Sequence, residues 1–183
     1  MPARLTVLSG PSGVGKGTVV ARLRQVVPRI WVSVSCTTRT ARPGEVDGVQ
    51  YRFVTRPQFD AMVAAGELLE HAEFAGQCYG TPRAPLADRL AAGEPVLLEI
   101  ELQGARQVRA AMPGAQFVFL APPSIEILVR RLSGRHTESE AELAARMERA
   151  RIEMAAADEF DHVVVNDDLD RAVAEVAALV TAP

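Results

Sequence analysis

The chain has 183 residues, of which 48% are hydrophobic and 23% charged, and this size and composition fit one compact domain with its own core. A formal net charge of -3 at pH 7 excludes a globally basic nucleic-acid binder, so any anion site must be a local pocket. Two cysteines exclude a disulfide scaffold, and no apolar run approaches the roughly 18 residues that span a bilayer.

The cysteines and the start of the chain indicate a compartment. Cys36 and Cys78 form neither a CxxC pair nor a zinc pattern, so we expect reduced thiols. A strand-like run from Leu5 to Leu8 begins close to Met1 and leaves no room for a signal peptide. We therefore expect a cytoplasmic protein without nucleic-acid or membrane partners. A homo-oligomer stays open, because no sequence pattern indicates one.

Short β-rich apolar runs alternate with helical patterns along most of the chain. Strands are expected at 5–9, 96–100 and 117–120, with a buried last strand at 163–165. Helices are expected at 18–27, 104–111, 124–132, about 140–157 and from Leu169 onwards. This alternation predicts an α/β fold, a three-layer parallel sheet with helices on both faces, of the kind found in P-loop NTPases.

The alternation of predicted strands and helices is interrupted between Ser35 and about Leu90. Two Gly-containing turns precede a predicted strand at 51–54, and Thr55 is the expected cap of a short helix through Ala65. This segment predicts a mixed α+β insertion at about 35–94. The single domain then has its core at about 1–34 and 95–183.

A glycine-rich loop follows the first predicted strand and begins the first predicted helix. It comprises Gly10, Pro11, Ser12, Gly13, Val14, Gly15, Lys16, Gly17 and Thr18. The glycines let backbone N–H groups face inward, the helix N-terminus adds partial positive charge, and the lysine reaches the β- and γ-phosphates of a nucleotide. The loop predicts a nucleoside triphosphate site with Lys16 as a catalytic cation. A chance glycine-rich turn is the alternative.

The loop departs from the usual pattern directly after its lysine. Gly17 stands where a Ser or Thr hydroxyl commonly binds Mg²⁺, and the hydroxyl follows one residue later at Thr18. We therefore assign no direct metal ligand. Mg²⁺ is expected as the cofactor, held through water near Thr18 and an acidic residue elsewhere in the chain.

The segment Ser35 to Glu45 (SCTTRTARPGE), followed by Tyr51, resembles guanylate kinases, and the resemblance covers nearly the whole chain. It implies that the GMP phosphate is bound by two arginines and two tyrosines, namely Arg39, Arg42, Tyr51 and Tyr79. Arginine forks pair bidentately with phosphate oxygens, and phenols donate further hydrogen bonds. Solvated surface arginines and tyrosines packed in strands are the alternatives.

The same resemblance implies a guanine pocket. Glu70 matches the carboxylate that accepts hydrogen bonds from guanine N1–H and the exocyclic amine, while Ser35 and Thr81 would donate to O6. Adenine would leave these groups mispaired, and sites with buried polar partners reject such analogues by ~10⁴. An exposed carboxylate at the end of a strand is the alternative for Glu70.

Two acidic residues stand at the carboxyl end of the predicted strand at 96–100. Glu99 and Glu101 are two apart, so an extended chain points both the same way at the carboxyl end of the strand, where open α/β sheets bind ligands. Guanylate kinases usually carry aspartate at one or both matching positions. By resemblance, Glu99 is assigned to water-mediated Mg²⁺ binding or transition-state positioning, and Glu101 to the guanine base. A carboxylate at a helix N-terminus is the alternative for Glu101.

The segment Arg130 to Glu140 (RRLSGRHTESE) resembles the family's lid, at about 132–146. The matching arginines are Arg131, Arg135 and Arg146, which would stabilise charge on the transferred phosphoryl group. Asn166 matches the family's adenine contact, with a cap between strand and helix as the alternative.

These assignments predict transfer of the γ-phosphoryl group of ATP-Mg to GMP, with dGMP as a further candidate acceptor. Two alternatives stay open. One is a catalytically inert binding module of the same fold, against which the complete phosphate loop argues. The other is a kinase of the same fold that acts on a ribose phosphate, for which Ser35, Glu70 and Thr81 would have no guanine to recognise.

Overall fold

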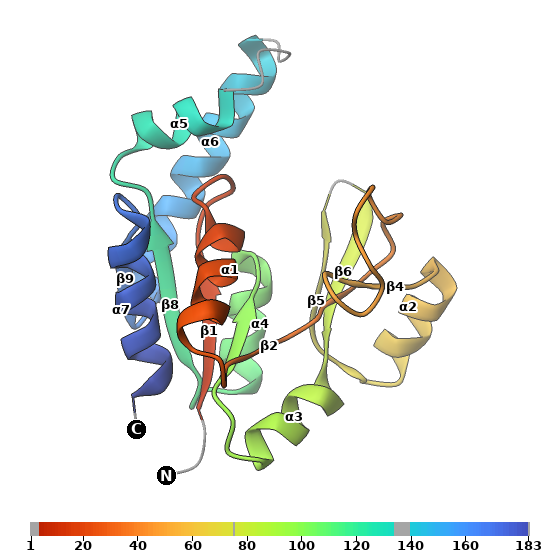
Figure 1. Cartoon of the computed structure of the whole chain (residues 1–183). Coiled ribbons are helices and arrows are strands. Elements are labelled where there is room, and N and C mark those ends of the chain that lie inside the picture. The colour runs from red at the N-terminus through yellow and green to blue at the C-terminus, as the bar shows by residue number, and fades with distance from the viewer. Residues whose placement is uncertain (1–3, 75, 134–139, 183) are drawn as a thin grey trace.

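The main sheet of the computed structural model is entirely parallel (Figure 1). The structure describes residues 4–74, 76–133 and 140–182. The strand order is β2-β7-β1-β8-β9, with β1 (Leu5–Ser9), β2 (Trp31–Val32), β7 (Val96–Glu99), β8 (Gln116–Ala121) and β9 (His162–Val165). The carboxyl ends of β1, β7 and β8 therefore meet at one edge of the sheet.

Helices cover both faces of this sheet (Figure 1). One face carries α1 (Lys16–Val26) and α7 (Leu169–Thr181), and the other carries α4 (Leu102–Ala111). Between β8 and β9 lie α5 (Ile125–Ser133), α6 (Glu140–Ala155) and the short 3-10 helix η1 (Ala156–Glu159). None of the helices that the structure describes is long and apolar enough to cross a membrane.

The central strand contributes to two apolar clusters. Val7 packs in the cluster beneath α4, and its neighbour Leu8 packs in the cluster beneath α1 and α7. Successive side chains of a strand point to opposite faces, so a strand between two helical layers must be apolar at both. The predicted three-layer α/β fold is confirmed.

A second, mixed sheet follows β2. Its order is β4-β3-β6-β5, with β3 (Cys36–Thr37), β4 (Arg52–Phe53), β5 (Leu68–Phe74) and β6 (Gln77–Pro82). Helices α2 (Arg56–Ala64) and α3 (Arg83–Ala91) belong to the same stretch. Thr55 caps α2 through a capping box with Gln58, as predicted. The mixed α+β character of this segment is confirmed.

The prediction that the last strand is buried is wrong for two of its three valines. Val163 and Val165 are 50% and 38% exposed, whereas Val164 is 2% exposed. β9 is the edge strand of the sheet, and only Val164 reaches the cluster beneath α1 and α7. An apolar run of three residues does not distinguish an edge strand with one open face from a strand covered on both.

This difference predicts unequal costs for neighbouring valines. We expect Val164→Ala to lower the free energy of unfolding by about 2 kcal/mol, because it removes buried methyl groups. Val163→Ala on the exposed face should change it by less than about 0.5 kcal/mol. Urea denaturation of the two variants measures both values, and equal losses would contradict the one-sided burial of β9.

Candidate functional site

The loop after β1 has a backbone that requires glycine. Gly10 and Gly15 have φ angles of 151° and 101°. A Cβ atom at Gly10 would lie 2.3 Å from the carbonyl oxygen of Leu120, and one at Gly15 would lie 2.8 Å from Nδ2 of Asn166. The loop thus passes closely between β8 and the end of β9, and α1 begins directly after it. This geometry is that of an anion cradle at a helix N-terminus.

Lys16 lies inside this loop and is 8% exposed. Its Nζ donates a hydrogen bond to the carbonyl oxygen of Gly10 at 2.6 Å, with Pro11 O at 3.3 Å, and lies 3.6 Å from a carboxylate oxygen of Glu101. A buried ammonium needs such partners, because burial penalises its charge. Lys16 therefore lies inside the loop with its charge compensated by these oxygens.

Two side chains hold the loop from outside. Asn166, 7% exposed, donates from Nδ2 to the carbonyl oxygen of Val14 at 2.8 Å. Arg131 donates to the same carbonyl and to the backbone carbonyl of Asn166, both at 3.2 Å. In this structure both side chains bind backbone carbonyls and thereby stabilise the loop. The contacts expected from the sequence, of Asn166 with adenine and of Arg131 with the phosphoryl group, stay predictions.

Glu99 and Glu101 both lie near Lys16, yet on different elements. Glu99 ends β7 and is half-buried, whereas Glu101 is the N-terminal cap residue of α4. Burial raises the pKa of Glu99, and the nearby Lys16 charge opposes that rise. The expectation that one strand carries both carboxylates is wrong, because the chain leaves the sheet after Glu99. The helix-start alternative for Glu101 is correct in position, although its side chain makes no cap hydrogen bond.

Glu70 is a buried carboxyl in the second sheet. It is 5% exposed, and Thr81 on the neighbouring strand β6 donates a 2.6 Å hydrogen bond to its Oε1. Burial raises the pKa of Glu70 to about 7, and the Thr81 hydrogen bond opposes the rise. The alternative of an exposed carboxylate is wrong. The Thr81 hydroxyl, which we expected to donate a hydrogen bond to guanine O6, donates here to the Glu70 carboxyl.

The predicted phosphate-binding group is assembled around Arg39. Its guanidinium lies 5.4 Å from the centre of the Tyr51 ring, which in turn lies 6.0 Å from that of Tyr79. Glu45 binds Arg39 through two hydrogen bonds of 2.8 and 2.9 Å and accepts a third from the backbone N–H of Arg42. Hydrogen bonds from Arg39 and then Arg42 lower the pKa of Glu45 to about 2.

The two sheets bring these groups toward one another. Burial raises the pKa of Tyr51, and the charge of Glu99, at the end of β7, contributes to that rise. Tyr51 comes directly before β4, so this interaction links the second sheet to the carboxylate that ends β7. Ser35 is half-buried just before β3, and Arg42 is exposed in the loop that follows β3.

Part of the predicted lid lies outside the described residues. Arg135 and Gly134 fall in the segment 134–139, and the side chain of Arg146 on α6 is likewise outside the description. Arg131 alone of the three lid arginines has a described position. Their common role stays a prediction.

Comparison with known proteins agrees with this geometry. A family model described as guanylate kinase matches residues 2–183. The chain belongs to the guanylate kinase family. A guanylate kinase from Frankia casuarinae is 65% identical over 98% of this chain and 97% of its own length, and one from Thermobifida fusca is 63% identical over 100% and 93%. A crystal structure of guanylate kinase from Anaplasma phagocytophilum has a TM-score of 0.80 at 35% identity, covering 98% of this chain and 85% of that one.

Two carboxylates to which the sequence analysis assigns no role contact the groups described above. Glu45 binds Arg39, as described above. The presence of a carboxylate six residues after the arginine is the one feature of the sequence that could have indicated this pair. Glu153 on α6 accepts a 3.1 Å hydrogen bond from the backbone N–H of Ser12 in the glycine-rich loop. No local pattern indicated Glu153, because 141 residues separate the two partners.

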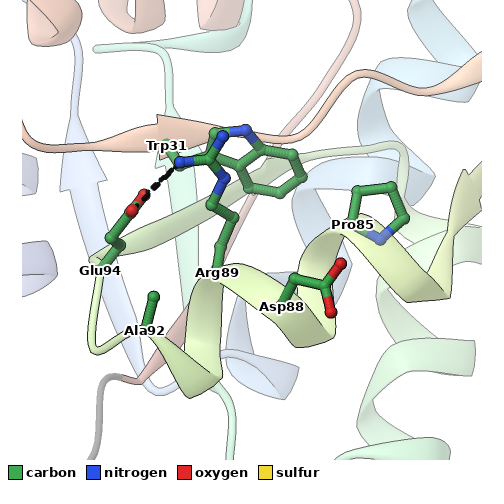
Figure 2. Close-up of a pocket in the computed structure, with 6 residues that line it drawn as sticks. All are labelled: Trp31, Pro85, Asp88, Arg89, Ala92 and Glu94. Carbon is green, nitrogen blue, oxygen red and sulfur yellow. Dashed lines mark hydrogen bonds and ion pairs between the residues drawn. The ribbon is translucent and has the colours of Figure 1, made fainter.

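A hollow of about 390 Å³ lies elsewhere on the molecule (Figure 2). It is lined by Trp31, Pro85, Asp88, Arg89, Ala92 and Glu94. Trp31 pairs with Val96 at the amino end of β7, whereas the glycine-rich loop follows the carboxyl end of β1. Because these are opposite ends of parallel strands, the hollow is separate from the glycine-rich loop. Within the hollow, Arg89 lies over the Trp31 ring and pairs with Glu94.

The buried Glu70 predicts a pH-dependent stability. Its carboxyl keeps its proton up to about pH 7 in the native protein and loses it near pH 4.5 when unfolded. The unfolded state therefore binds fewer protons in this window, and native stability falls as pH rises from 4.5 to 7, by roughly 3 kcal/mol. Glu70→Gln should lack this fall. Urea denaturation from pH 4.5 to 8 measures it, with the exposed Glu73→Gln on the same strand as control; identical wild-type and Glu70→Gln profiles would contradict it.

Proposed function

We propose that this chain transfers the γ-phosphoryl group of ATP to GMP, with ATP bound at the loop after β1 and GMP in the segment 35–94. The activity follows from membership of the guanylate kinase family over the whole chain. The observation that carries the division of roles is the presence of two separate cationic groups, Lys16 at the start of α1 after β1 of the main sheet and Arg39 just after β3 of the second sheet. Two anion sites fit two phosphorylated substrates.

The ATP side uses the backbone of the glycine-rich loop. Its N–H groups and Lys16 are proposed to bind the phosphates, and Thr18, exposed in the first turn of α1, is proposed to donate to the α-phosphate. Asn166 is proposed to lie beside the adenine while its amide holds Val14. Arg131 together with Arg135 and Arg146 is proposed to stabilise charge on the phosphoryl group during transfer.

The phosphate of GMP is proposed to bind among Arg39, Arg42, Tyr51 and Tyr79. Arg39 is already oriented by Glu45, so little side-chain freedom is lost when the phosphate binds. The aromatic rings beside the guanidinium limit its hydration and strengthen its attraction for an anion. The segment 35–94 then acts as the GMP-binding part of a single domain.

Guanine is proposed to be recognised by Glu70, with Ser35, Thr81 and Glu101 nearby. The ionised carboxylate accepts hydrogen bonds from the N1–H and the exocyclic amine, which adenine cannot supply in the same pattern. Thr81 orients the carboxylate through Oε1. Without GMP the pKa of the Glu70 carboxyl is about 7. Because GMP binds the ionised form, its binding below pH 7 releases a proton from Glu70.

Mg²⁺ is proposed to enter with ATP and to lie near Glu99 and Thr18. The fit rests on a half-buried carboxylate at the end of β7, whose Oε1 lies 4.0 Å from where a Cβ of Gly17 would be. One carboxylate suits Mg²⁺, which keeps several waters and binds nucleotide oxygens. When bound, the ion neutralises charge on the β- and γ-phosphates.

The chemistry needs little from the protein beyond placement and charge. An oxygen of the GMP phosphate forms a bond to the γ-phosphorus, and the bond from that phosphorus to the β–γ bridging oxygen breaks, leaving ADP and GDP. The attacking oxygen is already ionised at neutral pH, so no general base is assigned. In-line positioning and electrostatic stabilisation account for the rate.

The two alternative functions are not favoured. An inert binding module has no need of a buried Lys16 or of the hydrogen bonds that hold its loop. A ribose phosphate kinase has no need of a carboxyl as deeply buried as Glu70.

A reducing compartment is proposed from the cysteines. Cys36 and Cys78 are both free and buried in the second sheet, and such thiols persist in the cytoplasm.

An acceptor panel tests the proposed function. ADP production with ATP-Mg should occur with GMP and dGMP, and should be at background with AMP, CMP, UMP and ribose 1,5-bisphosphate, because only guanine pairs with Glu70. Lys16→Ala should lower turnover by about 10³ or more while GMP still binds. Turnover with the sugar phosphate alone would reject the guanine assignment, and normal turnover of Lys16→Ala would reject the ATP assignment.

Arg39→Ala should mainly weaken GMP. Loss of charge-assisted hydrogen bonds to the phosphate should raise KM for GMP by about 10- to 100-fold and leave KM for ATP within about twofold. Arg56→Ala, an exposed arginine of the same segment, is the matched control. Steady-state kinetics with each substrate varied in turn measures the split, and equal rises in both KM values would contradict a role of Arg39 that is specific to GMP.

A further inference from the structure

Helix α4 touches the carboxyl of Glu70 through a glycine. A Cβ atom on Gly104 would lie 2.4 Å from Oε2 and 3.1 Å from Cδ of Glu70, and 3.3 Å from Cδ1 of Ile100. Gly104 is itself buried. The carboxyl group therefore occupies the space that any side chain at position 104 would need.

The backbone of α4 does not require glycine at this position. Gly104 lies within the helix, with Glu101 as the cap residue, and its φ is not in the left-handed region. Glycine inside a helix is less stable than alanine because it gives up more conformational freedom. The close approach of Glu70 is the feature of the structure that accounts for a glycine here.

One turn further along the same helix, Gln107 fixes the strand that carries Glu70. Its Nε2 donates to the carbonyl oxygen of His71 at 2.7 Å, and its Oε1 accepts from the His71 backbone N–H at 3.1 Å. A paired bond to one residue of a strand fixes both the distance and the register of helix and strand. Helix α4 thus sets the position of β5 at the residue next to Glu70.

We infer that Gly104 and Gln107 are positioning residues for guanine recognition: the bare helix surface at Gly104 and the paired hydrogen bonds of Gln107 place the Glu70 carboxylate for two guanine N–H groups. The inference rests on the proposed role of Glu70. The same helix begins at Glu101, whose carboxylate lies 3.6 Å from Lys16 Nζ. One rigid element therefore joins the ATP side and the guanine side of the site.

Base specificity should depend on the absence of a side chain at position 104. A methyl group at position 104 displaces Oε2, because Thr81 holds Oε1 on the other side. The displaced carboxylate then keeps one of its two guanine partners at best. IMP lacks the exocyclic amine of GMP. Loss of the hydrogen bond from that amine to Glu70 therefore weakens GMP more than IMP.

Gly104→Ala tests the inference, with Gly114→Ala as matched control. Gly114 lies just beyond the same helix and has open space where its Cβ would be, so the chemical change is equal and the contact is absent. We expect Gly104→Ala to raise KM for GMP about tenfold, to lower the preference for GMP over IMP about fivefold, and to leave KM for ATP within about twofold. A merely structural role would lower the active fraction for all substrates and leave the GMP-to-IMP preference unchanged.

A second variant keeps the test independent of how Gly104→Ala folds. Gln107→Leu removes both hydrogen bonds to His71 at similar volume, and we expect it to lower the same GMP-to-IMP preference. Glu70→Gln distinguishes the guanine role of Glu70 from the positioning role of Gly104 and Gln107. If Glu70→Gln leaves GMP kinetics unchanged, the proposed guanine role of Glu70 fails and the inference with it. If Glu70→Gln weakens GMP while Gly104→Ala and Gln107→Leu behave as Gly114→Ala, the inference alone is overturned.

Discussion

Pairing of β1 with β7 on one side and with β8 on the other positions the groups of the site. In this register Leu8 of β1 lies beside Glu99, and Ser9 lies beside Phe119. The glycine-rich loop that leaves β1 therefore comes next to Glu99, which ends β7, and Glu101, which precedes α4. It also comes against Leu120 of β8, where only a glycine at position 10 fits. The buried apolar core on both faces of β1 holds that register, and so indirectly holds Lys16.

Charge in this site is kept in balance by protein partners. Lys16 has backbone carbonyls and Glu101, and Arg39 has Glu45. Glu70 differs, because among its described partners Thr81 supplies the hydrogen bond and burial raises its pKa to about 7. A carboxyl of this kind lowers stability at neutral pH, since the ionised form is poorly solvated. Guanine N–H groups would relieve that penalty, which makes the buried carboxyl a selective partner for the base.

Helix α4 connects these two arrangements. Its cap residue Glu101 lies against Lys16, and Gly104 and Gln107 within the helix lie against β5. A helix transmits position more reliably than a loop, because its internal hydrogen bonds fix each residue relative to the others. The distance between the donor and acceptor sites is therefore set partly by a helix that need not touch either phosphate.

The sequence by itself determined the α/β class, the phosphate loop and the order of most elements, because these depend on local periodicity and on short motifs, whereas the roles of the GMP-site residues rest on the resemblance to guanylate kinases. Only the tertiary structure decided which faces of β9 are open, that Glu101 starts a helix, and that Thr81 supports Glu70. It alone showed that Asn166 and Arg131 bind the carbonyl of Val14, that Glu153 reaches Ser12, and that Gly104 leaves room for Glu70. These contacts join residues far apart in the chain, and their distances follow from how helices pack on the sheets, which no local pattern encodes.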